Sequence, residues 1–133
     1  MAGIYYKFQK IAKLYKQKKA IVTEENYITY ESLKDKADLF EKYFDEIGFD
    51  EETVICLICD NSIEFLTCYL TAAKKNIVFI PIDTRLSYED MKRIVTCINP
   101  NAFICGKKYS DTGYRLLCEI NTDRAIFINS VSN

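Results

Sequence analysis

Three short polar runs carry residue types that bind anions or polar substrates, and each follows an apolar run of strand length. They are Asp60-Asn61-Ser62, Asp83-Thr84-Arg85 and Gly106-Lys107-Lys108. Open parallel α/β sheets bind ligands at the carboxyl ends of their strands. We therefore expect ligand or anion contacts from this set: Asp60, Asn61, Ser62, Asp83, Thr84, Arg85, Lys107 and Lys108.

These candidates also have structural interpretations. Asp60 or Asn61 can cap a helix that is predicted to begin near Ser62, although a helix N-terminus also attracts anions. A second case is a group of three cations, Lys107, Lys108 and Arg115. They would contact a phosphate or remain a solvated basic patch, since unpaired surface lysines are common. Both interpretations stay open from the sequence.

The side-chain sets that most often perform catalysis are missing from the sequence. It contains no histidine, which removes the commonest general base and the commonest metal ligand, and with them any Ser-His-Asp triad. None of its four glycines joins another in a phosphate-binding loop. The acidic pairs Glu24-Glu25 and Glu51-Glu52 fall in predicted loops. We expect no catalytic residue and no metal site in this chain.

The cysteines are interpreted as core residues rather than as ligands. Most of the six lie in apolar runs, where cysteine behaves as a small hydrophobic residue. Cys56 and Cys59 have the spacing of a redox or zinc motif, but residues three apart on a strand point to opposite faces. We expect all six thiols to be reduced and mostly buried, in a protein of the reducing cytoplasm.

Length and charge limit the class of protein. The 133 residues fit one domain, with 18 basic against 19 acidic residues. Such a balance does not steer a chain toward nucleic acid. No apolar run reaches bilayer length, and the start lacks the apolar core of a signal peptide. We expect neither a nucleic-acid partner nor a membrane partner.

The first helix is predicted over residues 3–18, where apolar residues recur at helical spacing. They are Ile4, Phe8, Ile11 and Tyr15. Lysines occupy the other faces, and a basic amphipathic helix of this kind can lie on a membrane surface. The alternative is a solvated lysine face above a docked apolar stripe. We favour the docked stripe, because it is the usual pattern of a surface helix.

The remaining pattern predicts an α/β fold with a mostly parallel sheet and flanking helices in βαβαβ units. A hairpin over 20–23 and 27–30 and a helix over 32–47 come first. Strands are then predicted over 54–59, 77–82, 102–105 and 125–129, separated by helices over 62–75, 87–98 and a shorter helical segment over 114–120. Continuous apolarity in these strands indicates burial on both faces, as in parallel sheets.

Four segments, taken in order, resemble the start of the adenylate-forming superfamily, which includes acyl-CoA synthetases, luciferases and nonribosomal peptide synthetase adenylation domains. Ile28-Thr29-Tyr30-Glu31-Ser32-Leu33 resembles its Thr-Tyr-x-Glu-Leu motif, and residues 54–65 resemble its strand followed by Asn-Ser-x-Glu-Phe. Residues 70–83 resemble its second core motif, and residues 87–98 resemble the helix that follows. The usual glycine of the second core motif is replaced around Lys75-Asn76.

The resemblance implies a single domain over residues 1–133, equivalent to the N-terminal subdomain of such an enzyme. In the family a carboxylate attacks the α-phosphate of ATP, giving an acyl-adenylate and pyrophosphate. The phosphate loop, the ribose-binding aspartate and the catalytic lysine would lie beyond Asn133. The resemblance therefore implies an N-terminal scaffold portion of an ATP-dependent carboxylate-activating ligase, inactive alone. No cofactor is expected in this chain alone, and ATP and Mg²⁺ are implied for the complete enzyme.

Two other functions stay open. The chain can be a non-catalytic interaction module or one subunit of a split adenylating enzyme, whose partner is the remainder of that enzyme or a second copy. Residues 62–75 and 125–129 are then the expected docking face. A flavodoxin-like nucleotide-binding domain is the weaker alternative, because the chain has no phosphate loop.

Overall fold

The computed structural model describes residues 2–120 and 126–129, which fall into two compact units. Residues 1–52 and 61–77 belong to a unit of three helices and a hairpin, the helical unit. Residues 53–60 and 78–133 belong to a unit built on a parallel sheet, the sheet unit. The single domain over residues 1–133 stays a prediction.

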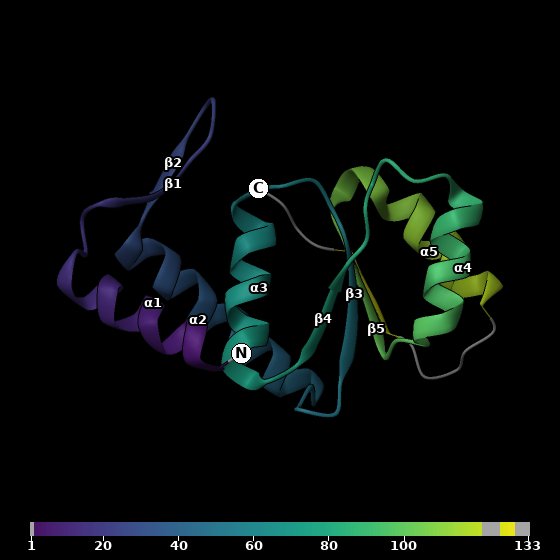
Figure 1. Cartoon of the computed structure of the whole chain (residues 1–133), viewed down its shortest axis with the longest axis horizontal. Helices are drawn as coiled ribbons and strands as arrows, with labels where there is room; N and C mark the ends of the chain where they lie inside the picture. The colour runs from purple at the N-terminus through teal and green to yellow at the C-terminus, as the bar shows by residue number, and fades with distance from the viewer. Residues whose placement is uncertain (1, 121–125, 130–133) are drawn as a thin grey trace. The chain divides into compact units, whose positions relative to one another are not determined.

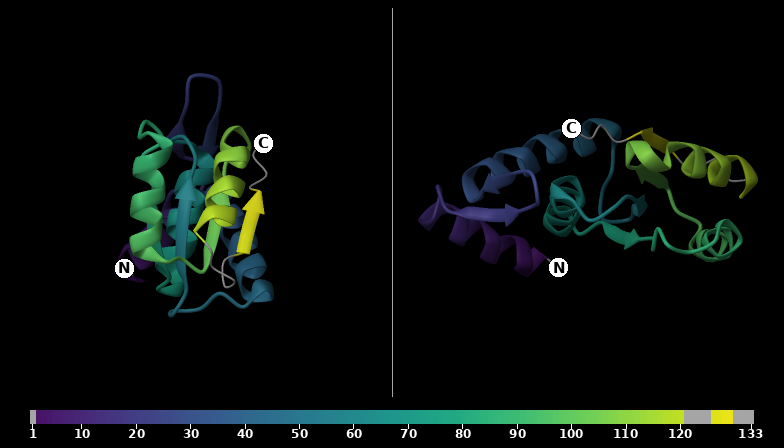
Figure 2. Two further views of the ribbon diagram at one scale, coloured as in Figure 1. Left: turned by 90° about the vertical axis from the view of Figure 1, so that its right-hand side faces the viewer. Right: turned by 90° about the horizontal axis from the view of Figure 1, so that it is seen from above.

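The helical unit packs α1 (Ala2–Leu14), α2 (Tyr30–Ile47) and α3 (Ile63–Lys75) around a small apolar core (Figure 1). The core combines Tyr5, Phe8 and Ala12 of α1 with Leu33 of α2 and with Leu70 and Ala73 of α3. The antiparallel hairpin of β1 (Lys19–Val22) and β2 (Tyr27–Thr29) projects beyond these helices (Figures 1 and 2). The predicted hairpin and second helix are confirmed; the first helix is confirmed too, but it ends at Leu14, four residues before the predicted end at residue 18.

The buried flank of α1 differs from the predicted stripe. The residues that it buries are Tyr5, Phe8 and Ala12, at positions i, i+3 and i+7. Of the predicted stripe only Phe8 is buried, while Ile4, Ile11 and Tyr15 are exposed. The apolar arc of the helix is wider than its contact with α2 and α3, so one edge of that arc stays in solvent. The sequence shows the arc but not which edge is covered.

The ends of α2 and α3 follow from their capping residues. The Thr29 hydroxyl accepts the N–H of Ser32 at 3.2 Å, so α2 begins two residues earlier than predicted. Gly48 ends it with φ of 95°, directly after the predicted end of the helix at residue 47. The Ser62 hydroxyl accepts the N–H of Phe65 at 3.1 Å and starts α3. Asn76 ends α3 with φ of 57°, so asparagine takes the left-handed position where the family usually has glycine.

The sheet unit contains four parallel strands in the order β4-β3-β5-β6. Their bounds are β3 Val54–Ile58, β4 Val78–Pro81, β5 Ala102–Cys105 and β6 Ile126–Asn129. Asn101 aligns β5 with β3, because its side-chain oxygen accepts the N–H of Val54 at 2.7 Å while its own N–H donates to the Val54 carbonyl at 2.8 Å. The predicted parallel sheet is confirmed; Ala125 of the last predicted strand lies outside the described residues.

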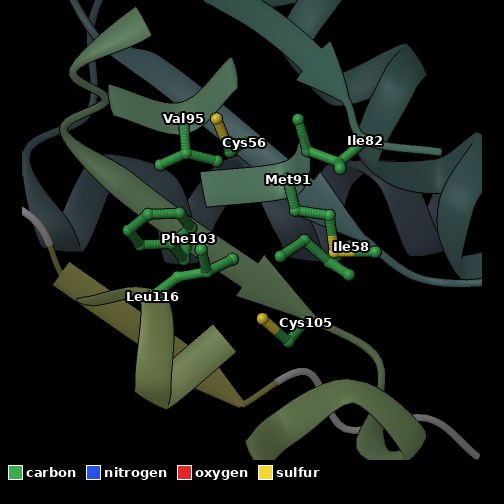
Figure 3. Close-up of a cluster of buried hydrophobic side chains, with 8 residues drawn as sticks. All are labelled: Cys56, Ile58, Ile82, Met91, Val95, Phe103, Cys105 and Leu116. Atoms are coloured by element: carbon green, nitrogen blue, oxygen red, sulfur yellow. The ribbon is translucent and has the colours of Figure 1, made fainter. Parts of the chain in front are cut away.

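Two helices cover one face of this sheet, α4 (Tyr88–Ile98) and α5 (Ser110–Glu119) (Figures 1 and 2). A short 3-10 helix, η1 (Lys107–Tyr109), precedes α5, which starts earlier than the predicted segment over 114–120. The core beneath them is one cluster of eight side chains, shown in Figure 3: Cys56, Ile58, Ile82, Met91, Val95, Phe103, Cys105 and Leu116. The alternate residues Ile55 and Leu57 are also buried, which confirms that β3 is buried on both faces.

The thiols are less uniformly buried than predicted. Cys56, Cys68 and Cys105 are buried and Cys59 is half-buried, whereas Cys97 and Cys118 are exposed. The two exposed thiols belong to amphipathic helices, where one side faces water. Within the described residues no disulfide joins any of the six cysteines, and no cluster of three acidic or cysteine side chains could hold a metal ion. None of the helices described is both long and apolar enough to cross a bilayer.

Candidate ligand-contact site at the carboxyl edge of the sheet

The parallel register of β3, β4 and β5 places their following loops at one edge of the sheet. Leu57 pairs with Pro81, and Ile58 pairs with Cys105, so the three strands end almost level. The Gly106 N–H donates to the Ile58 carbonyl at 2.9 Å and continues the ladder past β5. A Cβ at position 106 would lie 2.9 Å from the Cβ of Cys59, so the approach of the two chains requires glycine there.

Asp60 is the centre of this edge. Its carboxylate accepts the Tyr109 hydroxyl at 2.6 Å and lies 3.7 Å from the Lys108 ammonium. The Tyr109 hydrogen bond is the main cause that lowers the pKa of Asp60, and Lys108 and the Thr84 hydroxyl lower this pKa further. The sheet thus brings together groups that follow three different strands. Asp60, Thr84 and Lys108 were predicted for this edge.

Asp83 and Arg85 form a second, local pair at the same edge. The Arg85 Nε and Nη2 donate to the two oxygens of Asp83 at 3.0 Å each, and the Arg85 backbone N–H donates to Oδ1 at 2.9 Å. These bonds hold the pKa of Asp83 below its usual value and raise the pKa of Arg85. An anion would have to compete with Asp83 for this guanidinium.

The remaining candidates are Asn61, Ser62 and Lys107, and none of them joins these two groups. The cap of α3 is Ser62, so the interpretation of Asp60 or Asn61 as the cap is wrong. The predicted cluster of cations is also divided, because the guanidinium of Arg115 stacks 3.7 Å from the centre of the Tyr88 ring and contacts Glu119. Lys107 and Asn61 are exposed. The role of all eight candidates as ligand contacts stays a prediction.

Tyr109 is the residue that the sequence analysis missed. It directly follows Lys108, in the loop after the third strand, and its ring lies 5.5 Å from the Lys108 ammonium. Its position alone was a usable signal, because the other candidate residues are also polar side chains that follow a predicted strand. What the sequence does not show is its partner, Asp60, which lies 49 positions away.

This edge offers polar and charged contacts, and its two carboxylates are not proton donors at neutral pH. Both carboxylates have lowered pKa values, so at neutral pH they are ionised and cannot act as general acids. Hydroxyl, ammonium and guanidinium groups already occupy their oxygens.

Fold and site together define an α/β domain whose parallel sheet carries ion pairs and the Tyr109–Asp60 hydrogen bond at its carboxyl edge. A family model described as AMP-binding enzyme matches residues 8–128, and the chain belongs to this family. It is similar to an enniatin synthase of Fusarium equiseti, at 24% identity over 73% of this chain and 3% of that protein. A nonribosomal peptide synthetase of Aspergillus flavus is 25% identical over 69% of this chain and 1% of its own length.

The fold is shared with larger ligases of known structure. A fatty acyl-CoA synthetase of Mycobacterium tuberculosis superposes with a TM-score of 0.85 at 20% identity, covering 96% of this chain and 26% of that one. The chain thus spans about a quarter of that enzyme and about 3% of the enniatin synthase. The predicted resemblance to adenylate-forming enzymes is confirmed.

Proposed function

We propose that this chain is the N-terminal scaffold portion of an ATP-dependent, acyl-adenylate-forming ligase. The observation that carries the proposal is the family match over residues 8–128, in a chain that covers about a quarter of a similar solved ligase. The strand edge is consistent with a scaffold, because Asp60 and Asp83, whose pKa values are lowered, are already paired with Lys108 and Arg85. Membership of this family also argues against the flavodoxin-like alternative.

On this proposal the chain has no adenylating activity by itself, and ATP and Mg²⁺ are used by the complete enzyme. Carboxylate-dependent exchange of labelled pyrophosphate into ATP should stay at background for the purified 133-residue chain. A complete adenylating enzyme, assayed in parallel with the same set of carboxylates, provides the positive control. Exchange that co-elutes with the chain through successive purification steps would contradict the proposal.

A second candidate function is that of one subunit of a split adenylating enzyme or of a non-catalytic interaction module. The part of the predicted docking face that lies on α3 is smaller than expected. Cys68, Leu70, Ala72 and Ala73 of this helix are buried, and Leu66 is its exposed large apolar side chain. The partner is proposed to be the remainder of the enzyme or a second copy. Light scattering over a range of concentrations tests the second copy, and a strictly monomeric chain would rule it out.

We place the protein in the cytoplasm on the same proposal.

A further inference from the structure

One flank of α1 exposes apolar side chains that no other part of the helical unit covers. Ile4, Ile11 and Leu14 are separated by seven and three positions, so they share one side of the helix, and Tyr15 continues it. All four are exposed, Leu14 to 75%. Lys7 lies on the same side, four positions before Ile11. We call these five residues the α1 flank.

The charge around this flank has one sign. Residues 1–23 contain six lysines and no acidic residue, the lysines being Lys7, Lys10, Lys13, Lys16, Lys18 and Lys19. Within residues 2–120 none of the six forms an ion pair, whereas Lys34, Lys74 and Lys75 of the same unit are paired with carboxylates. A helix is only about 10 Å across, comparable to the Debye length at about 0.1 M salt, so the three lysines of α1, Lys7, Lys10 and Lys13, all act on a surface that meets the flank.

Aromatic rings accompany these lysines. The Lys10 ammonium lies 4.9 Å from the centre of the Tyr6 ring, and the Lys18 ammonium lies 4.8 Å from the centre of the Tyr15 ring. Tyrosine and lysine both combine an apolar body with a polar tip, which is the composition of the boundary between lipid tails and headgroups. The hairpin tip, with Glu24 and Glu25, is excluded from this surface by its charge.

We propose that the α1 flank binds an anionic lipid bilayer, with lysines on the headgroup phosphates and with Ile11, Leu14 and Tyr15 at the acyl boundary. The sequence favoured a helix whose apolar stripe, with Ile4 and Ile11, is docked on the protein. In the structure α1 docks through other residues, so Ile4 and Ile11 stay exposed. An acidic protein is the competing partner. The lipid is favoured because the flank joins four exposed apolar or aromatic side chains to Lys7, in a segment whose charges are all positive, which suits insertion into an anionic interface. This inference is independent of the proposed function.

Vesicle sedimentation with the whole 133-residue chain tests the proposal. The chain should sediment with vesicles of phosphatidylcholine plus phosphatidylserine, less with phosphatidylcholine alone, and less at high salt. Lys7→Glu should weaken binding roughly tenfold, since each lysine near an anionic surface counts and reversal adds repulsion. Leu14→Gln should weaken it roughly fivefold through lost apolar burial.

Matched controls separate the flank from a general loss of charge or apolarity. Lys42→Glu and Leu39→Gln make the same changes at exposed positions of α2, and both variants should bind as the wild type does. Circular dichroism confirms that each variant is folded. The proposal is overturned if folded Lys7→Glu binds vesicles like the wild type or if the α2 variants lose binding equally. Binding of polyglutamate without any binding of anionic vesicles would assign the surface to an acidic protein instead.

Discussion

The Tyr109 hydroxyl donates a 2.6 Å hydrogen bond to the carboxylate of Asp60, two residues that lie 49 positions apart in the chain. The bond joins the loop after β3 to the end of η1, just before α5, and it is the main reason for the lowered pKa of Asp60. One contact therefore both ties two connections of the sheet unit together and fixes the charge of the central carboxylate at its edge.

Removing this hydroxyl should raise the pKa of Asp60 toward its ordinary value. A lowered pKa in the folded protein contributes stability above the unfolded pKa, and this contribution is lost as pH falls through the folded pKa. Tyr109→Phe should therefore lose stability at neutral pH and approach the wild type at strongly acidic pH. NMR titration of the Asp60 carboxyl measures the shift, and Tyr6→Phe, at an exposed tyrosine of α1, is the control. An unchanged titration in Tyr109→Phe would contradict the assignment.

Leu116 should be a principal anchor of α5. Its side chain is fully buried against the sheet in the cluster of Figure 3. Leu116→Ala should lower the free energy of unfolding by about 2–5 kcal/mol, the usual cost of a cavity in a packed core. Leu39→Ala removes the same atoms from an exposed position and should change it by less than about 0.5 kcal/mol. Urea denaturation measures both; equal losses would show that α5 is not held by this residue.

Much of the fold could be predicted because its signals are local. Runs such as Val54–Ile58 and Ala102–Cys105 are apolar throughout, and Ser62, Ser87 and Gly48 mark helix ends by their own chemistry. These features need no knowledge of distant residues. They were enough to predict a parallel sheet and to place the candidate loops at one of its edges.

What the sequence could not show depends on contacts between distant segments. The buried side of α1 is decided by how closely Ala12 and Tyr5 approach the neighbouring helices, and nothing in the spacing of Ile4 and Ile11 reveals it. The pairing of Tyr109 with Asp60 likewise exists only once β3 and β5 lie side by side. The candidate site was therefore found as a location, without its hydrogen bonds.

Replacing Asn76 by glycine should destabilise the protein less than replacing it by alanine. Its φ of 57° lies in the left-handed region, which glycine adopts freely and which a Cβ disfavours. Asn76→Ala should cost about 1 kcal/mol of stability, whereas Asn76→Gly should be neutral or slightly stabilising. Thermal denaturation measures both variants. Asn61 lies outside the left-handed region, so alanine should be tolerated better than glycine at this position. If glycine were preferred over alanine at both positions, the conformational explanation would be wrong.

The thiols should react in two groups at neutral pH. Cys97 and Cys118 are exposed on α4 and α5, so two thiols should be modified quickly by an aromatic disulfide reagent. Buried Cys56, Cys68 and Cys105 should react only as the chain unfolds, and Cys59 at an intermediate rate. The double variant Cys97→Ala/Cys118→Ala should lose the fast phase and keep four thiols after denaturation. A fast phase that survives in this variant would mean that the strand thiols are accessible.

Alkaline pH should destabilise the sheet unit through its two buried strand thiols. Burial raises the pKa of Cys56 and of Cys105 from 9.0 to about 12. Above pH 9.0 these thiols ionise in the unfolded chain but stay protonated in the folded one. The stability that the two buried thiols contribute is complete below pH 9.0. It is lost progressively as the pH rises from 9.0 to about 12. Each thiol adds a slope of roughly 1.4 kcal/mol per pH unit within the window.

Urea denaturation at a series of pH values across that window tests this, because slopes can be compared even if a variant is less stable throughout. Cys105→Ala should lower the free energy of unfolding at neutral pH and flatten its fall with pH, since one of the two thiols is gone. Cys97→Ala removes an exposed thiol and should reproduce the wild-type slope. If Cys105→Ala falls as steeply as the wild type, the alkaline loss comes from other groups and not from burial of the strand thiols.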